Sequence, residues 1–313
     1  MLHVPPSQPD QVLVVVNPTA GRRAADREVD RFRPMAARKG LVATILTDLS
    51  EVADRANQWH AEGRLRALVG VGGDGTAAEL VNRTLPGVPI TLLAAGTANL
   101  LARHFGLAAS AEELCRTVTA GRAIPVDAGI ASGRMFLLMA SCGLDADVVR
   151  RVHDFRAGQR GGHISYWTYV KPILQSIRSY QYPQLRVYCD SSGDGATGGP
   201  GRCLAARWAL ACNLPRYAWG VAVAPQADPA DGLLDYCTFG RGSLWHGLRY
   251  VAAAQLGIHG RLADCTLGRA RRLRFEADEP VPYQLDGDPG GFLPLDVEVL
   301  PRRLTLIVPT PAT

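Results

Sequence analysis

The chain has 313 residues, of which 47% are hydrophobic and 20% are charged, and its formal net charge is +5. This length and composition predict a soluble globular protein of about two domains. No window reaches the roughly 18 uninterrupted apolar residues that a membrane-spanning helix needs. The N-terminal MLHVPPSQPD has neither the basic nor the apolar region of a signal peptide. We therefore expect no membrane-spanning helix and no signal peptide.

The residue types that bind metals or carry charge narrow the prediction further. The seven cysteines include no CxxC pair, which argues against a disulfide framework and a zinc site and predicts reduced thiols in the cytoplasm. No metal-binding spacing of the histidines and no GxSxG motif is present, so the histidines receive no role. The basic residues include only two lysines, Lys39 and Lys171, so arginine carries the positive charge. A mildly basic surface would suit phosphates or an anionic membrane.

From the N-terminus, the first third of the chain alternates signals for strands and helices. Apolar runs are typical of buried strands, and the stretches between them have helical periodicity, with Ser50 as a predicted helix cap. This alternation predicts a parallel sheet with helices on both faces, whose ligands bind at the carboxyl ends of the strands. We predict strands at 11–16, 41–47, 65–73 and 88–95 and helices at 26–40, 50–63, 76–85 and 97–106.

Beyond residue 123 the chain changes to short strand-like runs joined by Gly and Pro turns, and their spacing predicts an antiparallel β-sandwich. The predicted fold is therefore α/β plus all-β, with a doubly wound α/β domain over 1–123, rejoined by 302–313, and a β-sandwich domain over 124–301. The predicted strands are 124–131, 134–143, 185–190, 203–213, 220–225, 233–239, 273–277, 281–288 and 295–301, interrupted by amphipathic helices at 164–180 and 243–257 and a flexible loop at 190–201.

A glycine-rich segment, GVGGDGTAAELVN at 70–82, joins the third predicted strand to the third helix. It contains the spacing GxGxxG of dinucleotide-binding loops, but no acidic residue follows about 20 positions later, and no lysine completes a Walker A loop. The glycines let main-chain N–H groups face a polyphosphate, and the aspartate among them can orient a phosphate-bound Mg²⁺ ion. A tight surface turn is the alternative. The residues of this predicted phosphate cradle are Gly72, Gly73, Asp74, Gly75 and Thr76, the last as the cap of the helix.

The sequence GGDGT followed by Glu79 resembles the nucleotide loop shared by diacylglycerol kinases, sphingosine kinases, NAD kinases and phosphofructokinases. Three further matches select the diacylglycerol kinase and lipid kinase branch. The sequence NPTAG at 17–21 resembles the family's NPxxG, GTAN at 96–99 resembles its GTxN segment, and GLDA at 143–146 resembles its GxDA element. The matches run in order along essentially the whole chain.

The resemblance implies a nucleotide site and a structural metal site. The loop PQADPADGLLDY at 225–236 is similar to the family's loop that holds a Mg²⁺ ion. Without that resemblance, an ADG sequence between strands predicts only an ordinary turn. By resemblance, Asp228, Asp231 and the main-chain oxygen of Leu233 are the metal ligands. The nucleotide contacts implied in the same way are Asn17, Thr47, Gly72, Gly73, Asp74, Gly75, Thr76, Glu79 and Thr97.

The segment YQLDGDP at 283–289 resembles the family's DGE segment, whose glutamate is the general base toward the lipid hydroxyl. Here the residue is Asp288, which is one methylene shorter, and a displacement on the order of 1 Å can lower a rate roughly 100-fold. The backbone compensates, Asp286 assists, or activity is low. The alternative is that DGD is only a hairpin turn. Ala78 is a second departure, since the family usually has Asn there.

Aromatic and basic residues around the predicted helix 164–180 bear on the acceptor. An acyl chain or a bilayer interface would suit them, although packing in the core is the alternative for each aromatic residue. Because a lipid acceptor lies in a membrane, we expect the protein to dock on the membrane surface without entering it, through the amphipathic segments 164–180 and 243–257. The aromatic and aliphatic residues are Tyr166, Trp167, Tyr169 and Ile173, and the arginines are Arg150, Arg151, Arg156 and Arg160.

The sequence thus predicts an ATP-dependent and Mg²⁺-dependent lipid kinase that phosphorylates the hydroxyl of a diacylglycerol-like lipid, with Asp288, Asp74 and Asp286 as catalytic residues. A soluble NAD-kinase-like enzyme for small molecules and a non-catalytic lipid- or nucleotide-binding regulator are the alternatives. We expect a cytoplasmic protein associated peripherally with the inner face of the membrane, and no nucleic-acid partner. The sequence leaves a homodimer open.

Overall fold

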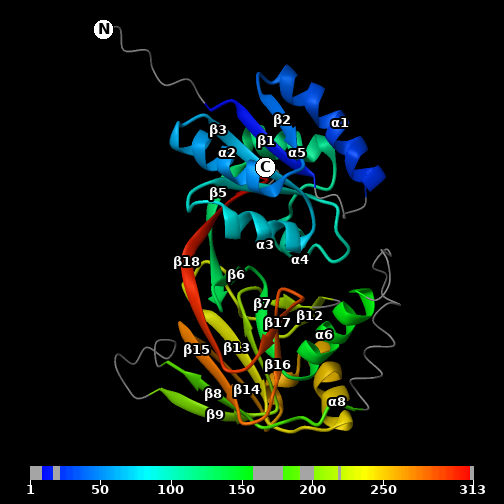
Figure 1. The fold of residues 1–313 in the computed structure, drawn as a ribbon, viewed down its shortest axis with the longest axis vertical. Coiled ribbons are helices and arrows are strands. Elements are labelled where there is room, and N and C mark those ends of the chain that lie inside the picture. Colours follow the sequence, from blue (N-terminus) through cyan, green and yellow to red (C-terminus); the bar gives the residue numbers. More distant parts are fainter. Residues whose placement is uncertain (1–8, 17–21, 158–178, 191–200, 218–219, 311–313) are drawn as a thin grey trace. The chain divides into compact units, whose positions relative to one another are not determined.

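The computed structural model describes residues 9–16, 22–157, 179–190, 201–217 and 220–310. The chain divides into two compact units, which we call unit 1 (residues 1–126 and 302–313) and unit 2 (residues 127–301). The border between them falls after residue 126, within strand β5 (Arg122–Ala131). The sequence predicts the end of the first domain at residue 123, in the same strand. Each unit has its own sheet structure and its own core (Figure 1).

Unit 1 is built around a parallel sheet. Its strands are nearly continuous apolar runs, as strands covered on both faces are, and four of the six residues of β1 are buried. The pairing is parallel throughout, for example Val12 with Ala43 of β2 and with Ala67 of β3. The strand order is β2 (Val42–Leu46), β1 (Gln11–Val16), β3 (Leu65–Gly72), β4 (Pro89–Ala94) and the C-terminal part of β18 (Leu295–Val308).

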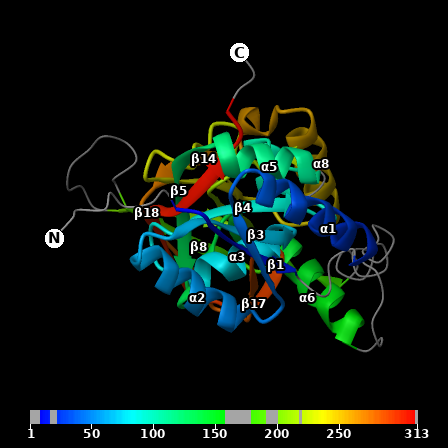
Figure 2. The same ribbon diagram turned by 90° about the horizontal axis from the view of Figure 1, so that it is seen from above.

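Helices cover both faces of this sheet (Figure 2). Alternate residues of a strand point to opposite faces, and Val12 and Val14 pack into one core cluster with residues of α1 and α5. On the opposite face Leu80 of α3 lies over Gly70. The predicted doubly wound α/β fold is confirmed. The helices of unit 1 are α1 (Arg22–Arg38), α2 (Leu49–Ala61), α3 (Asp74–Arg83), α4 (Leu100–Phe105) and α5 (Ala111–Ala120).

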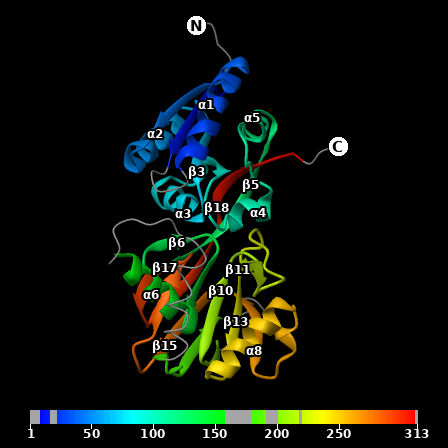
Figure 3. The ribbon, with the colours of Figure 1, turned by 90° about the vertical axis from the view of Figure 1, so that its right-hand side faces the viewer.

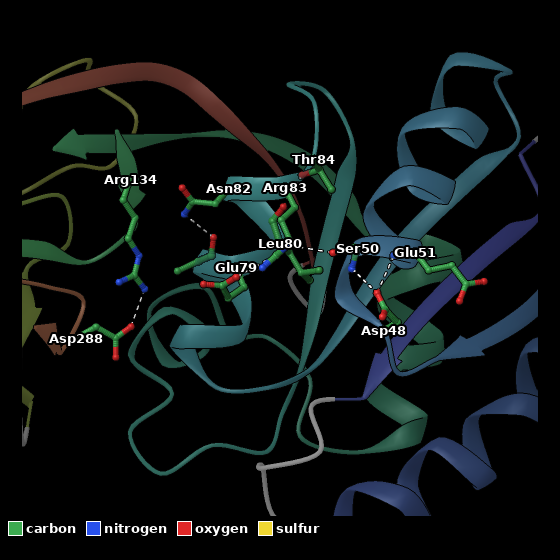
Figure 4. A network of polar contacts seen from close by, with 11 residues as sticks. Asp48, Ser50, Glu51, Glu79, Leu80, Asn82, Arg83, Thr84, Arg134 and Asp288 are labelled. Atoms are coloured by element: carbon green, nitrogen blue, oxygen red, sulfur yellow. Dashed lines mark hydrogen bonds and ion pairs between the residues drawn. The ribbon is translucent and has the colours of Figure 1, made fainter. Parts of the chain in front are cut away.

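Two predicted helix caps in unit 1 are wrong, and one helix was not predicted. Helix α2 is capped by Asp48, which accepts hydrogen bonds from the N–H groups of Ser50 and Glu51 at 2.8 and 3.0 Å, so the predicted Ser50 cap is wrong (Figure 4). The predicted Thr76 cap is also wrong, because α3 begins two residues earlier. Helix α5 was not predicted, although Ser110 followed by Glu113 is the pattern of a capping box.

Unit 2 contains two antiparallel sheets that face each other across one core, as the predicted β-sandwich requires. One sheet has the order β14 (Cys265–Ala270), β13 (Leu234–Phe239), β10 (Trp208–Cys212), β7 (Met139–Cys142), β16 (Pro282–Leu285) and β17 (Asp288–Phe292). The other consists of the N-terminal part of β18, β15 (Arg272–Ala277), β8 (Leu185–Cys189) and β9 (Arg202–Ala206), with β5 and β6 (Arg134–Phe136) beside β18.

Two predicted strands of unit 2 are each divided in the structure. The run 134–143 becomes β6 and β7, because the N–H groups between them turn to the carboxylate of Asp286. The run 203–213 becomes β9 and β10, which belong to different sheets.

The helices of unit 2 whose full bounds lie in the described residues are α6 (Leu144–Ala157), α8 (Leu244–Gln255) and the short η4 (His259–Arg261). Helix α8 confirms the prediction at 243–257, whereas α6 was not predicted. A pair of two-residue strands, β11 (Arg216–Tyr217) and β12 (Val221–Ala222), lies apart from both sheets. In the part of the chain that the structure describes, no helix is both long and apolar enough to cross a bilayer.

Candidate active site

The start of helix α3 is rich in glycine because two loops approach each other there, main chain to main chain. A Cβ atom added at Gly96 would lie 2.6 Å from the Cα atom of Gly73, and one added at Gly72 would lie 2.2 Å from the Thr76 hydroxyl oxygen. The Ala95 N–H donates to the Gly72 carbonyl oxygen at 2.9 Å. Since only glycine fits at these contacts, GGDGT and GTAN form one paired structure at the ends of β3 and β4.

Asp74 holds these two loops together. Its two carboxylate oxygens accept hydrogen bonds from the N–H groups of Leu100 and Leu101, at 3.0 and 2.9 Å, and so cap the start of α4. Burial raises the pKa of the Asp74 carboxyl, while the Leu101 and Leu100 hydrogen bonds and the nearby Arg103 oppose that rise. Each oxygen of a carboxylate has a second lone pair, so a ligand can still be bound. Asp74 is therefore a half-buried loop anchor and not the bare carboxylate that the sequence suggests.

Asn99 completes the paired loops; it belongs to the GTAN motif at 96–99, but the sequence prediction gave it no role. It is in the left-handed region, with φ of 49°. Its side chain accepts from the Gly96 N–H at 2.9 Å and donates to the Gly96 carbonyl oxygen at 2.8 Å. The signal was available, because asparagine is among the few residues other than glycine that adopt this conformation.

The other predicted nucleotide contacts follow the carboxyl ends of parallel strands. Thr47 comes directly after β2 and Thr97 after β4, and both residues are exposed. Because β1 to β4 are parallel, these residues and the start of α3 lie along one edge of the sheet. Glu79 lies a turn further along α3, where its carboxylate accepts from Arg83 at 3.1 Å (Figure 4). The structure thus brings the loop residues together, and Glu79 has a local arginine partner.

An open pocket of about 710 Å³ lies beside these loops, within unit 1. Asn99 and Arg103 line it from the α4 side, and Arg116 lines it from α5. Arg103 also lies close enough to Asp74 to oppose the rise of its pKa, so the side of the pocket next to the paired loops carries positive charge. No sequence motif marks Arg116, so the pocket could not be predicted from the sequence.

In unit 2, Asp286 is the first residue of a two-residue hairpin turn. Asp286 and Gly287 have φ values of 52° and 90°, and they join β16 to β17. The Asp286 carboxylate accepts hydrogen bonds from three consecutive N–H groups, those of Leu137, Leu138 and Met139, at 2.7, 2.8 and 3.0 Å. This arrangement favours a role in positioning the turn over the predicted role as an assisting base.

Asp288 leaves the hairpin on the exposed side. Its carboxylate forms an ion pair with Arg134, at 2.6 Å, and more than half of its side chain is accessible to solvent (Figure 4). Arg134 was missed by the sequence prediction, because nothing in the local sequence links β6 with a turn about 150 residues later. The ion pair uses one carboxylate oxygen, so the other can accept a proton.

The GxDA element, for which the sequence suggested no role, forms a buried polar network behind this hairpin. Asp145 accepts a short hydrogen bond from Ser141 and another from the Trp208 indole N–H at 2.7 Å. Gln284 donates to Ser141 at 2.8 Å and accepts from the Gly287 N–H at 2.7 Å. Burial raises the pKa of the Asp145 carboxyl, and these hydrogen bonds oppose the rise. The network ties α6 and β10 to the turn that precedes Asp288.

The predicted metal ligands lie in one loop of unit 2, but each carboxylate also caps the local turn. Asp228 accepts from the Ala230 N–H at 3.0 Å, and Asp231 accepts from the Leu233 N–H at 2.9 Å. Asp235 lies nearby, and burial, with help from Asp231 and Asp228, raises its pKa to about 6. This group of carboxylates fits a cation, and Arg269 already pairs with Asp231 at 3.5 Å. In the described ranges, no three or more His, Cys, Asp or Glu side chains form a metal-binding group, so the predicted site rests on two carboxylates and one carbonyl oxygen.

Several predicted residues lie outside the described part of the chain. They include Asn17 and the rest of the motif at 17–21, and the segment that carries the aromatic residues. Arg150 and Arg151, which are described, both pair with the buried Asp147 of α6, at 2.9 and 2.6 Å. The undescribed candidates are Asn17, Tyr166, Trp167, Tyr169, Ile173 and Arg160, together with the side chain of Arg156.

Replacing Gly75 with alanine is expected to separate ligand binding from folding. A Cβ atom at Gly75 would meet no atom within 4 Å, and alanine favours a helix, so the melting temperature should stay the same or rise slightly. The methyl group would obstruct an anion at the first N–H groups of α3, and the affinity for ATP should fall at least roughly tenfold, the value of one hydrogen bond to a charged group. Titration calorimetry and thermal unfolding measure both quantities.

The matched change is Gly96→Ala in the neighbouring loop. There the added methyl group would collide with the main chain of Gly73, so we expect a clearly lower melting temperature. Unchanged ATP affinity in Gly75→Ala would remove Gly75 from the predicted site.

Comparison with known proteins places both units in one family. Residues 11–131 match the model of the diacylglycerol kinase catalytic domain, and residues 139–308 match the YegS C-terminal NAD kinase beta sandwich-like domain. The chain is 24% identical to the diacylglycerol kinase of Bacillus subtilis, over 95% of each chain. It is 28% identical to the diacylglycerol kinase of Mycobacterium tuberculosis (strain H37Rv), over 78% of this chain and 77% of the other.

Solved structures show the same fold. A diacylglycerol kinase from Bacillus anthracis superposes with a TM-score of 0.66 at 18% identity, covering 96% of this chain and 97% of the other. An NAD kinase from Archaeoglobus fulgidus in complex with ATP superposes with a TM-score of 0.52 at 12% identity, covering 96% and 94%. An α/β unit with a glycine-built loop, joined to a β-sandwich unit, is thus the fold of a class of kinases. The chain belongs to the diacylglycerol kinase family within that class.

Proposed function

We propose that the protein is a lipid kinase, which transfers the γ-phosphate of ATP to the hydroxyl of a diacylglycerol-like lipid. The start of α3 carries this proposal, because Gly75 leaves open space there beside the first N–H groups of a helix. A relative that matches 95% of this chain is a diacylglycerol kinase, which favours a lipid hydroxyl as the acceptor. The NAD kinase that shares the fold was solved with ATP, which favours ATP as the donor.

In this proposal each unit has its own task. The N–H groups at the start of α3 bind and orient the phosphates, and Asp74 keeps the two loops in register. Asp288 accepts the proton of the lipid hydroxyl while the oxygen of that hydroxyl forms a bond to the γ-phosphorus of ATP. The bond between the γ-phosphorus and the leaving ADP breaks in the same step. Arg134 orients the Asp288 carboxylate through their ion pair. The Asp286 turn and the Gln284 hydrogen bonds fix the position of Asp288 in unit 2.

Two magnesium ions belong to the proposal. One, bound with the nucleotide, would neutralise phosphate charge, and Asp74 has lone pairs left to bind or orient it. The second would be structural, held by Asp228, Asp231 and the Leu233 carbonyl oxygen. Burial is the main cause of the raised Asp235 pKa, and the Asp231 and Asp228 carboxylates, which add to it, favour a cation there. Asp228 and Asp231 would then be acting on the stability of unit 2 and not on the transferred phosphate.

The test is a kinase assay with ATP labelled in the γ-phosphate, Mg²⁺, and either diacylglycerol vesicles or NAD as acceptor. We expect labelled phosphatidic acid, identified by mass, and loss of product when EDTA removes the metal. Labelled NADP in place of lipid product would favour the NAD-kinase-like alternative. The regulator alternative is kept open by Asp288 and Ala78, and ATP binding without any labelled product from a total lipid extract would support it.

A further inference from the structure

An exposed apolar surface in unit 2 takes no part in the site described above. Half of the large hydrophobic residues that are exposed in the described chain fall between residues 245 and 258. Single exposed apolar residues are ordinary, but a contiguous group usually marks an interaction surface. The group, which we call the α8 face, consists of Trp245, Leu248, Val251, Leu256 and Ile258, with exposed fractions of 77%, 48%, 40%, 72% and 40%.

Trp245, Leu248 and Val251 form one side of helix α8, whose other side is packed, and Leu256 and Ile258 follow the C-terminal end of the helix. Gly247, Tyr250, Ala253 and Ala254 are buried at helical spacing, and Gly247 packs against Leu144 of α6. The Tyr250 ring stacks on Phe239 at 4.4 Å between ring centroids, so the orientation of the helix on unit 2 is fixed. Helix α8 runs along the outside of unit 2 (Figure 3). The apolar residues therefore face solvent because the fold directs them outward.

The surroundings of the α8 face are positively charged. Residues 240–263 contain no Asp or Glu. Arg249 and Arg241 share one carboxylate, that of Asp264, which leaves a net positive charge, and Arg261 is exposed on η4. The side chains of Arg241 and Arg249 are 66% and 45% exposed. An apolar stripe with a basic border is the pattern of helices that lie in the plane of a membrane interface.

We propose that the α8 face docks unit 2 on an anionic lipid bilayer, with Trp245 and Leu248 at the boundary between headgroups and acyl chains. The basic border decides between a bilayer and a second copy of the chain. A twofold dimer through this face would bring two basic borders together, whereas anionic headgroups would neutralise them. The inference rests on the proposed function, because a kinase that acts on a lipid must dock on the membrane. Docking can be measured without any kinase reaction.

The test is cosedimentation with phosphatidylcholine vesicles, with and without phosphatidylglycerol. We expect the protein to bind the vesicles that contain phosphatidylglycerol and to lose that binding at high salt. The double variant Trp245→Gln, Leu248→Gln should lower the partition coefficient by tenfold or more, since both apolar side chains would be buried in the lipid. Arg261→Gln should lower it about fivefold, and only for the anionic vesicles.

Leu85→Gln is the matched control, because Leu85 is a 57% exposed apolar residue of unit 1, and its variant should bind as the parent does. Thermal unfolding should show that every variant is folded. Unchanged binding of the double variant would overturn the proposal. The proposal would also be overturned if the parent protein were a dimer and the double variant a monomer, since the α8 face would then join two copies of the chain.

A water-soluble short-chain diacylglycerol separates this inference from the proposed function. The double variant should phosphorylate that acceptor like the parent and lose activity only on diacylglycerol in vesicles. If neither protein phosphorylates any lipid but the variant alone fails to bind vesicles, docking by α8 stands and the proposed kinase function fails.

Discussion

Replacing Asp288 with asparagine is expected to lower the rate of lipid phosphorylation by about 10² to 10⁴-fold, the range typical of a lost general base. Asparagine is close to aspartate in size, and Asp288 is exposed at the end of its hairpin, so the fold should be unaffected. Steady-state kinetics with saturating ATP should show the loss in kcat, with little change in the KM for ATP.

The matched control is Asp296→Asn. Asp296 is also an exposed carboxylate of unit 2 paired with an arginine, Arg274, at 2.7 Å, so this change breaks an equivalent ion pair away from the hairpin. Its activity should equal that of the parent. In a further variant, Asp288→Glu, the longer side chain of the family should keep or raise turnover. Full activity in Asp288→Asn would mean that another group takes the proton.

Replacing Asp74 with alanine is expected to lower activity at least 100-fold and also to weaken unit 1. The change removes two hydrogen bonds that cap α4, a loss of about 1 to 2 kcal/mol in unfolding free energy. It also frees the GTAN loop from the GGDGT loop, so the phosphates would no longer be bound in a fixed position. A lipid kinase assay with product identification by mass, together with thermal unfolding, measures both effects.

Ser110→Ala separates these two effects. Ser110 caps α5 in the same unit by accepting the Glu113 N–H, so its loss should lower stability by a similar order and leave activity near that of the parent. If Asp74→Ala were destabilised but kept its turnover, Asp74 would only be a helix cap and the nucleotide site would lie elsewhere.

The first four strands of unit 1 could be predicted almost to the residue because each is an apolar run between clear turn signals, whereas the part of β18 that pairs with β4 was not predicted as a strand. The first predicted strand, 11–16, coincides with β1. The strands of unit 2 were harder to delimit, because a strand there ends where a distant residue takes its hydrogen bonds. The gap between β6 and β7 depends on Asp286, nearly 150 residues later in the chain. Local sequence carries no trace of such a contact.

The candidate site shows the same limit. The glycine-rich loop could be predicted as a phosphate cradle, since glycine density and a nearby helix start are local signals. The partners of its aspartate could not, because Leu100 and Leu101 offer only main-chain N–H groups, and any residue type would supply those. The ion pair of Asp288 with Arg134 is equally invisible, since arginines occur throughout this chain. The sequence therefore indicates which residues are important, but it rarely indicates which atoms each of them contacts.

The discontinuity of unit 1 bears on how the protein is made. The part of β18 that pairs with β4 emerges from the ribosome after the whole of unit 2, although most of unit 1 precedes unit 2. Until then β4 has an unpaired edge, and the residues that Leu304, Leu306 and Ile307 will cover are open to solvent. The sandwich can thus complete its folding during synthesis, whereas the sheet with the glycine-rich loop is finished only by a strand that is translated after unit 2.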